Sequence, residues 1–432
     1  MGLGTALHAQ PTPDTLRLDV VVHKALQENV QAQIARNDAA LARNNRSLGN
    51  AGFLPDVTVT GGYSETRSSI EQQRADGFTL DTTGVRSDRW NGAAELRWRL
   101  FDGLGRFATY DRLGAERDRQ AAATREQVEV VVANVIDAYY DVARQQRQRA
   151  VFQEAVAISR ERLRIAETRR DVGTASDLDV RQARVDLNTD SADVLRQNVA
   201  LQTAQATLFQ LLGDDAPPSR VAVSNRINVD PALSFDALLQ TARAQSPALR
   251  QAEQVRRAAE AETHEIRAEY FPALDATLGY GYSRFAGGTG FLLSSRTRDL
   301  TYGLSLTFNV FDGLNRERRK QNAEIRARTA ALRIQDVETR LRSEIQSAFA
   351  SYQNRLQIVA LERENLSIAE ANVDLALERF RLGTITSVAL RDVQEQRIQA
   401  ESRLLAARFD AKRAETELLR LSGQLLQRTR QR

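Results

Sequence analysis

The stretch LTYGLSLTFNVFDG, residues 300–313, changes from one structural period to another within a few residues. As far as Val310, hydrophobic residues alternate with small or polar ones, which is typical of a β-strand with one apolar face. From Leu314 to Leu382 the apolar residues instead recur at helical spacing, and no proline interrupts them. A strand is therefore expected to lead directly into a very long helix.

The same transition occurs earlier, because Trp98-Arg99-Leu100-Phe101-Asp102-Gly103 also precedes a long helical pattern. Phe101 and Phe311 are 210 positions apart, and the pairs 173–174 and 383–384, both Gly-Thr, keep that spacing. Upstream, Phe53-Leu54-Pro55 and Tyr270-Phe271-Pro272 are 217 positions apart. Self-similarity at a fixed spacing indicates that one structural unit is used twice.

Each copy is predicted to contain a helix, two strands, a long helix and a return helix, so the chain is mainly α-helical. The strands of the first copy are placed at 56–64 and 90–101, and those of the second copy at 273–283 and 300–311. The expected divisions are a signal remnant or N-terminal tail at 1–15, a first repeat at 16–213, a connector at 214–232, a second repeat at 233–423 and a C-terminal tail at 424–432.

Composition excludes several classes of protein. The 432 residues include no cysteine, and the three histidines are not at ligand spacing, so no disulfide, metal site or cofactor is predicted. The net charge of +4 arises from arginines interspersed among 56 acidic residues. Such a pattern indicates solvated helix faces, and we expect no nucleic-acid partner.

The four predicted strands carry aromatic residues on their apolar faces, and each is long enough for a tilted crossing of a bilayer. A soluble sheet would explain any one of them, but the four together favour a membrane β-barrel. Four strands cannot close a barrel, and lipid does not tolerate unpaired strand edges. We therefore expect a barrel that is shared among protomers in an obligate oligomer.

The long helices are predicted at 104–172 and 314–382, each ending at a Gly-Thr turn, and the return helices at 177–212 and 387–422. A long helix of 69 residues would extend for about 104 Å. The first helix of each copy, expected to have about 35 residues, and the return helix together nearly match that length. We expect the two shorter helices to stack end to end beside the long one, with a seam at mid-length.

This repeated order, with its Phe-Asp-Gly junctions, proline corners and the Arg381-Leu382-Gly383-Thr384 turn, resembles the TolC family of outer-membrane efflux proteins. The resemblance implies a homotrimer in which a twelve-stranded outer-membrane barrel, four strands from each protomer, continues into an α-helical barrel in the periplasm. Members are passive exit ducts with porin-like or efflux transport activity, and they are not enzymes. They serve tripartite efflux pumps or type I secretion, and pass drugs, metals, siderophores or polypeptides.

The resemblance also implies functional residues. The helical-hairpin tips would dock a periplasmic adaptor (membrane fusion protein) and so reach an inner-membrane pump or ABC exporter, while outer-membrane lipid surrounds the strands. The tip residues are Gly173, Thr174, Gly383 and Thr384. The strand-to-helix junction residues are Phe101, Asp102, Gly103, Phe311, Asp312 and Gly313. The candidate entrance-gate residues are Asp177, Asp179, Asp392, Arg381 and Arg391.

The expected gate differs from the family pattern. Members that lock the entrance with a tyrosine and an arginine beside the second tip glycine have Phe380 and Ile385 at these positions here. We therefore predict that Arg381 or Arg391 pairs instead with Asp177 or Asp179 of a neighbouring helix pair. The alternative is that these aspartates are ordinary carboxylates at a helix start, favoured by the helix dipole.

Two other classes of protein explain less of the sequence. A soluble coiled-coil scaffold, or a periplasmic adaptor without a pore, would explain the helices and the charge but not the four matched strands. An enzyme is disfavoured because the sequence contains no Ser-His-Asp or Cys-His set, metal cluster or phosphate-binding loop.

Overall fold

The computed structural model describes residues 15–73, 75–214, 222–224, 226–288 and 293–431. The predicted N-terminal remnant therefore lies outside the described residues except for Thr15, as do positions 215–221 and 225 of the predicted connector. The chain forms two compact units. One comprises residues 1–39, 121–251 and 334–432, and the other comprises residues 40–120 and 252–333.

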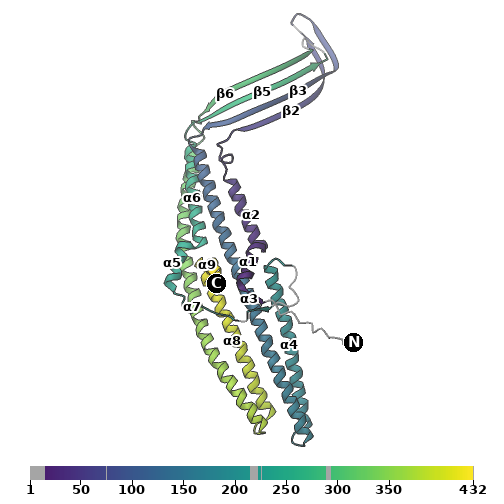
Figure 1. Cartoon of the computed structure of the whole chain (residues 1–432). Coiled ribbons are helices and arrows are strands. Elements are labelled where there is room, and N and C mark those ends of the chain that lie inside the picture. Colours follow the sequence, from purple (N-terminus) through teal and green to yellow (C-terminus); the bar gives the residue numbers. More distant parts are fainter. Residues whose placement is uncertain (1–14, 74, 215–221, 225, 289–292, 432) are drawn as a thin grey trace, which may run out of the picture. The chain divides into compact units, whose positions relative to one another are not determined.

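The order of elements is the same in both halves of the chain (Figure 1). The first half contains α1 (Leu18–Glu28), α2 (Val30–Asn45), β2 (Asp56–Gln73), β3 (Thr79–Phe101), α3 (Gly105–Asp171) and α4 (Asp177–Leu211). The second contains α5 (Phe235–Gln245), α6 (Pro247–Ala268), β5 (Ala273–Gly287), β6 (Ser294–Thr307), α7 (Asn315–Arg381) and α8 (Ser387–Leu421). The remaining elements are β1 (Thr15–Leu16), β4 (Ala222–Val223) and α9 (Leu425–Gln431).

The two long helices, α3 and α7, have 67 residues each, and the return helices α4 and α8 have 35 each. Their surfaces carry many charged residues, in keeping with the charge pattern of the sequence. Within the described parts of the chain, no helix has both the length and the apolar composition needed to cross a membrane.

The first helix of each half is broken, which corrects the single helix of about 35 residues expected from the sequence. Asn29 interrupts the first copy, where its side chain accepts a hydrogen bond from the Ala32 backbone N–H at 3.1 Å and so caps α2. In the second copy Pro247 starts α6, and a proline has no N–H to continue the preceding helix. The residues between the two helices of each pair, Asn29 and Ser246, are 217 positions apart, so the breaks are equivalent.

Each return helix ends against one of these breaks, which is the seam expected at mid-length. The Asn29 side chain donates to the backbone oxygen of Leu211 at 2.8 Å, where α4 ends. The backbones are so close that a Cβ built on Gly213 would lie 2.9 Å from the oxygen of Glu28. A Cβ built on Gly423, after α8, would likewise lie only 3.0 Å from the oxygen of Gln245.

The main hydrophobic core of the first unit lies around this seam. It contains fully buried residues from α1, α3, α4, α7 and α8, among them Val132, Leu208, Ile345 and Leu418. The predicted C-terminal tail takes part, since α9 places Leu425 in the core with an exposed fraction of 2%. These last residues therefore form a packed helix, because their apolar side chains reach the core.

The second unit contains an antiparallel sheet with the strand order β2-β3-β5-β6 (Figure 1). Its register places Val57 opposite Leu96, Leu96 opposite Leu278 and Leu278 opposite Tyr302, so one face of the sheet is apolar. The other face carries mainly small, polar and charged residues. Strands β2 and β6 form the two edges of the sheet.

The strand limits differ from those expected. Strands β2 and β3 extend to Gln73 and back to Thr79, well past the predicted limits at 64 and 90, because backbone pairing continues through polar residues that show no apolar alternation. Strand β6 ends at Thr307, although the alternation continues to Val310. Thr307 is opposite Ala273, the first residue of β5 after Pro272, so residues 308–311 have no partner in β5.

The strand-to-helix junction at 101–105 combines a helix cap with two unusual backbone conformations. The Asp102 carboxylate accepts a hydrogen bond from the Arg106 backbone N–H at 2.9 Å, at the start of α3. Gly103 and Leu104 have φ values of 69° and 70°, so the chain passes through two consecutive left-handed residues. This turn redirects an extended chain into a helix within three residues.

The second junction repeats this geometry. Asp312 accepts from the Arg316 backbone N–H at 2.9 Å, and Gly313 and Leu314 have φ values of 69° and 63°. The Phe-Asp-Gly motif thus has a physical basis in the aspartate cap and in the left-handed glycine.

The two junction glycines give a matched test of this turn. An alanine Cβ at position 103 would lie 2.3 Å from the Ala268 oxygen and 2.8 Å from the Phe271 Cβ, whereas at Gly313 the nearest atom would be Asn315 Nδ2 at 3.7 Å. Gly313→Ala should cost about 1 kcal/mol of backbone strain. Gly103→Ala should cost more than about 3 kcal/mol, because it adds a collision with backbone to the same strain. Thermal unfolding in detergent measures both, and equal losses would contradict this explanation.

Candidate functional site at the helical-hairpin tips

The tip between α3 and α4 is a tight, hydrogen-bonded helix end within the first unit. Gly173 has a φ of 77°, and its N–H donates to the Arg170 oxygen at 2.9 Å. The Thr174 N–H donates to the Arg169 oxygen at 2.8 Å, and the Thr174 hydroxyl donates to the same oxygen at 3.1 Å. These bonds satisfy carbonyl groups at the end of α3, as in a Schellman turn.

The tip between α7 and α8 has the same construction. Gly383 has a φ of 77° and donates to the Phe380 oxygen at 3.0 Å. The Thr384 N–H and hydroxyl donate to the Arg379 oxygen at 2.9 and 3.0 Å. All four predicted tip residues are exposed, so each turn presents a small, rigid surface.

The helix starts after the two tips differ in charge. Ser176 and Asp179 form a reciprocal capping box at the start of α4: the Asp179 N–H donates to Ser176 Oγ at 3.2 Å, and the Ser176 N–H donates to the Asp179 carboxylate at 2.9 Å. The hydrogen bonds from Ser176 lower the pKa of Asp179 below its usual value, so it remains ionised. In α8, Thr386 caps the Ala389 N–H at 3.2 Å, but Ala389 returns no carboxylate.

The other predicted gate residues are exposed. Asp177 lies in the first turn of α4, Asp392 accepts a bond from Gln396 at 3.1 Å, and Arg381 ends α7. Among the residues described by the structure, none of Asp177, Asp179 and Asp392 forms an ion pair with an arginine. The sequence thus placed these groups near the tips, but within one chain they do not bind one another.

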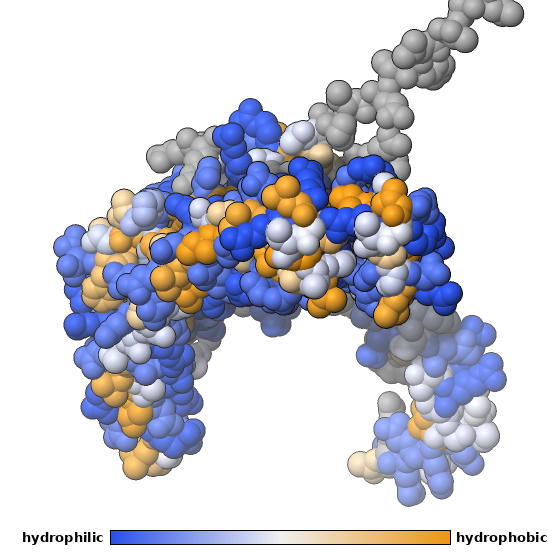
Figure 2. Space-filling model, turned by 90° about the horizontal axis from the view of Figure 1, so that it is seen from below, coloured by the Kyte–Doolittle hydropathy of each residue, from blue (hydrophilic) through white to orange (hydrophobic). Residues whose placement is uncertain are grey.

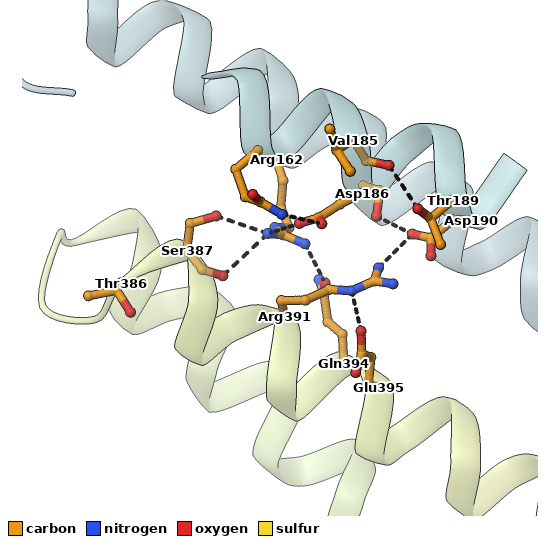
Figure 3. Close-up of polar contacts among 12 residues, drawn as sticks. Arg162, Val185, Asp186, Thr189, Asp190, Thr386, Ser387, Arg391, Gln394 and Glu395 are labelled. Carbon is orange, nitrogen blue, oxygen red and sulfur yellow. Dashed lines mark hydrogen bonds and ion pairs between the residues drawn. The ribbon is translucent and has the colours of Figure 1, made fainter. Parts of the chain in front are cut away.

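Arg391 has different partners from those expected. Its Nη1 lies 2.8 Å from the Asp190 carboxylate of α4, and its Nε lies 2.7 Å from Glu395 (Figure 3). The predicted pairing with Asp177 or Asp179 is therefore wrong for Arg391 within the chain. Asp179 is occupied by its own cap, and Asp190 lies farther along α4, where α8 packs. Although burial opposes the charge, the hydrogen bond and charge of Asp190 raise the pKa of Arg391.

A buried arginine extends this contact between the two hairpins. Arg162 of α3 has an exposed fraction of only 2%, and its Nη2 lies 2.9 Å from the Asp186 carboxylate of α4. The same nitrogen donates to Ser387 Oγ of α8 at 2.9 Å, and Nη1 donates to Gln394 at 3.4 Å (Figure 3). Burial lowers the pKa of Arg162, and Asp186 opposes that effect.

We call this set the inter-hairpin network. Its members are Ser159, Arg162, Asp186, Asp190, Ser387, Arg391 and Gln394. Two arginines face two aspartates, so the formal charges of these four groups cancel, and hydroxyl and amide groups add further hydrogen bonds. Ser159 donates to the Asp190 carboxylate, which thereby receives bonds from both hairpins.

A second contact joins the hairpins closer to the tips. Arg169 of α3 donates to the Phe380 backbone oxygen at 2.5 Å, at the end of α7, and its guanidinium lies 4.7 Å from the centre of the Phe380 ring. Phe380 is buried in a small cluster with Ala376 and Leu390. The position that is tyrosine in some members thus serves here as an apolar and cation–π contact.

The inter-hairpin network was not predicted from the sequence, although the sequence contains a signal for it. Asp190 lies on a buried stripe of α4 with members every seven residues, from Ala183 to Gln197 and Ala204. Arg162 likewise lies between the buried residues Ala155 and Ala166 at helical spacing. A charged residue on an apolar stripe indicates a buried partner, which Asp186 of α4 supplies for Arg162 and Arg391 of the second hairpin supplies for Asp190.

Comparison with known proteins places this site in a family. The sequence profile described as Outer membrane efflux protein matches residues 21–214 and 238–424, which is most of the chain. The chain therefore belongs to the outer membrane efflux protein family. It is an exit duct of the outer membrane with its helical tunnel in the periplasm, and it is not an enzyme.

Individual relatives agree with this assignment. Outer membrane efflux protein BepC of Brucella suis is 22% identical over 98% of this chain and 88% of its own length. Outer membrane protein TolC of Vibrio cholerae is 25% identical over 87% and 83%. Protein CyaE of Bordetella pertussis is 30% identical, but over 64% of this chain and 56% of its own.

Solved structures show the same fold. Those of CusC match with a TM-score of 0.73 at 18% identity, covering 96% of this chain and 95% of the other. The open state of the MtrE outer membrane channel of Neisseria gonorrhoeae matches with a TM-score of 0.72 at 17% identity, covering 95% and 89%.

The inter-hairpin network provides a stability test with a matched control on the same helix. Asp190→Asn leaves the charge of Arg391 without its buried partner, and should lower the free energy of unfolding by about 3 kcal/mol. Asp193→Asn removes a largely exposed pair with Arg196, and should cost less than about 1 kcal/mol. Denaturant titration in detergent measures both, and equal midpoints for the two variants would show that the network does not stabilise the protein.

Proposed function

We propose that three copies of this chain form one exit duct, in which a twelve-stranded barrel is built from four strands of each copy. The observation that carries the proposal is the open, four-stranded sheet with one apolar face and two edge strands, β2 and β6. Unpaired peptide groups at such edges cost several kcal/mol each in lipid, and strands of neighbouring copies would satisfy them. Pairing of β6 with β2 of the next copy closes the ring.

Exposed apolar side chains on the helices of the first unit support the same assembly. On α4 and α7 they recur along each helix, and hydrophobic residues lie among hydrophilic ones on the surface seen in Figure 2. Those more than 45% exposed are Leu178, Val185, Leu195, Val199, Ile358, Leu361, Ile368 and Leu375. Exposed apolar residues that recur along one helix suit an interaction surface, and here neighbouring copies would cover them.

The hairpin tips are proposed to dock a periplasmic adaptor and, through it, an inner-membrane pump or ABC exporter. The rigid glycine turns at 173 and 383 expose the same small residues in both repeats, which suits a partner that contacts each tip alike. The duct has no energy source of its own, so transport is driven by the inner-membrane partner.

The proposed entrance gate consists of Asp177, Asp179 and Asp392, with Arg381 as a neighbouring exposed cation, whereas Arg391 is bound by Asp190 and Glu395. Threefold symmetry would bring three copies of each exposed aspartate around the narrow end of the tunnel. Like charges gathered there attract cations and repel each other. The lowered pKa of Asp179 keeps its charge present at neutral pH.

Conductance across a planar lipid bilayer, combined with the mass of the purified protein in detergent, tests the assembly. The expected result is discrete channels from a particle with three times the mass of one 48.2 kDa chain. A water-soluble particle without conductance would contradict the duct and support a coiled-coil scaffold instead.

The gate is tested by comparing two aspartates close to the first tip. Asp179→Asn removes the charge but keeps an oxygen for the Ser176 cap, and should weaken the block of the channel by divalent cations about tenfold. Asp171→Asn is the control, because Asp171 already pairs with Arg170 at 2.6 Å. If both variants are blocked like the unaltered protein, Asp179 has no part in the gate.

A further inference from the structure

Three arginines cluster on the apolar face of the sheet, at the end of β5 and the beginning of β6. Arg284 lies directly opposite Arg296, and Arg298 lies opposite Tyr282 on the same face. Like charges directly opposite one another on adjacent strands destabilise a sheet, since their Cβ atoms are only about 5 Å apart. The cluster therefore destabilises the sheet by charge repulsion, which an anion from outside the sheet would relieve.

Carboxylates of the chain do not neutralise this cluster. On the same face, Glu65 and Asp88 bind other arginines: Glu65 lies 2.8 Å from Arg86 and 3.3 Å from Arg67, and Asp88 lies 3.2 Å from Arg86. Among the residues that the structure describes, no ion pair involves Arg284, Arg296 or Arg298, and all three side chains are exposed. Three positive charges per chain are thus available to an external anion.

The position of the cluster along the strands indicates its surroundings. On β5 the apolar face runs from Leu274 to Tyr282, about 27 Å at about 3.4 Å per residue. At a strand tilt of about 40° this run rises about 21 Å, and Arg284, two residues further on, reaches about 26 Å, which is the upper edge of an apolar band about 25 Å tall. Tyr282 is therefore where an interfacial aromatic residue is expected. Arg284 follows two residues later and so lies just beyond the band.

The direction of the strand identifies the leaflet. Strand β5 begins five residues after the end of α6, and the helices are periplasmic, so Leu274 is at the inner side of the membrane. Arg284, Arg296 and Arg298 are at the opposite end, level with the headgroups of the outer leaflet. They also share the face of the residues that would contact lipid, among them Leu300 and Tyr302.

We propose that Arg284, Arg296 and Arg298 form a binding site for phosphate-bearing lipid headgroups of the outer leaflet. The proposal rests on the proposed membrane-spanning barrel. Guanidinium groups bind phosphate oxygens through paired hydrogen bonds, and a bound phosphate offsets the repulsion between Arg284 and Arg296. The ligand is a lipid rather than free phosphate, because its acyl chains would lie along the apolar residues directly below the cluster.

The experiment uses purified full-length protein in detergent, with diphosphorylated lipid A as the probe and native mass spectrometry as the measurement. The unaltered protein should bind this lipid more tightly than the same lipid without phosphates. Arg284→Gln/Arg296→Gln/Arg298→Gln should weaken binding of the phosphorylated lipid by about a hundredfold. The corresponding triple lysine variant should bind with intermediate affinity, because it keeps the charge but loses the bidentate geometry.

The control is Arg89→Gln, which removes an exposed arginine at the same height. Arg89 is opposite Phe285, on the other face of the sheet, and its guanidinium lies 5.8 Å from the centre of that ring. Arg89→Gln should leave lipid binding unchanged. If the triple glutamine variant does not assemble, Arg296→Gln alone is compared with Arg89→Gln, and a weaker affinity for Arg296→Gln alone is then expected.

Three results would overturn the proposal. They are unchanged lipid affinity in the glutamine variants, an equal loss of lipid affinity in Arg89→Gln, or displacement of the lipid by inorganic phosphate at a concentration equal to that of the phosphate groups of the lipid. Conductance of each sample separates this failure from that of the proposed duct. Unchanged channels with unchanged lipid affinity would reject the lipid site alone, whereas absent channels in the unaltered protein would reject the barrel.

Discussion

Backbone hydrogen bonding at the edges of the sheet is the constraint on which the rest of this protein depends. A sheet of four strands leaves the peptide groups along the outer sides of β2 and β6 without strand partners among the described residues. In water such edges are solvated, but in lipid each unpaired group costs several kcal/mol. A single copy is therefore an incomplete unit for a membrane, and the exposed apolar stripes of the helices indicate the same incompleteness.

The two hairpins are joined near their tips by charges, whereas the seam region is joined by apolar packing. A buried ion pair adds little net stability compared with apolar residues of similar size, because both ions lose their hydration. It does fix which atoms face each other across the junction, as Arg391 and Asp190 do (Figure 3). Such a junction can separate more readily than an apolar core, since the ions regain water when they part.

The two repeats share a framework but differ in their local chemistry. The first helix breaks at an asparagine cap in one copy and at Pro247 in the other. The aspartate that completes a capping box in the first hairpin, Asp179, has Ala389 as its counterpart in the second. The backbone requirements, a helix break and a helix start, are thus met twice, while acidic residues occur in the first turn of α4 and not in that of α8.

The sequence alone determined the order of the elements, because periodicity, glycine turns and proline corners act locally along the chain. The Phe-Asp-Gly junctions and the Gly-Thr tips could be located to within a residue or two for that reason. Only the tertiary structure decided the strand limits, since β6 ends at the residue that pairs with the first residue of β5. It also decided the partner of Arg391, since Asp190 belongs to the other hairpin. Contacts between residues 201 positions apart depend on how helices pack, and helical period does not specify that packing.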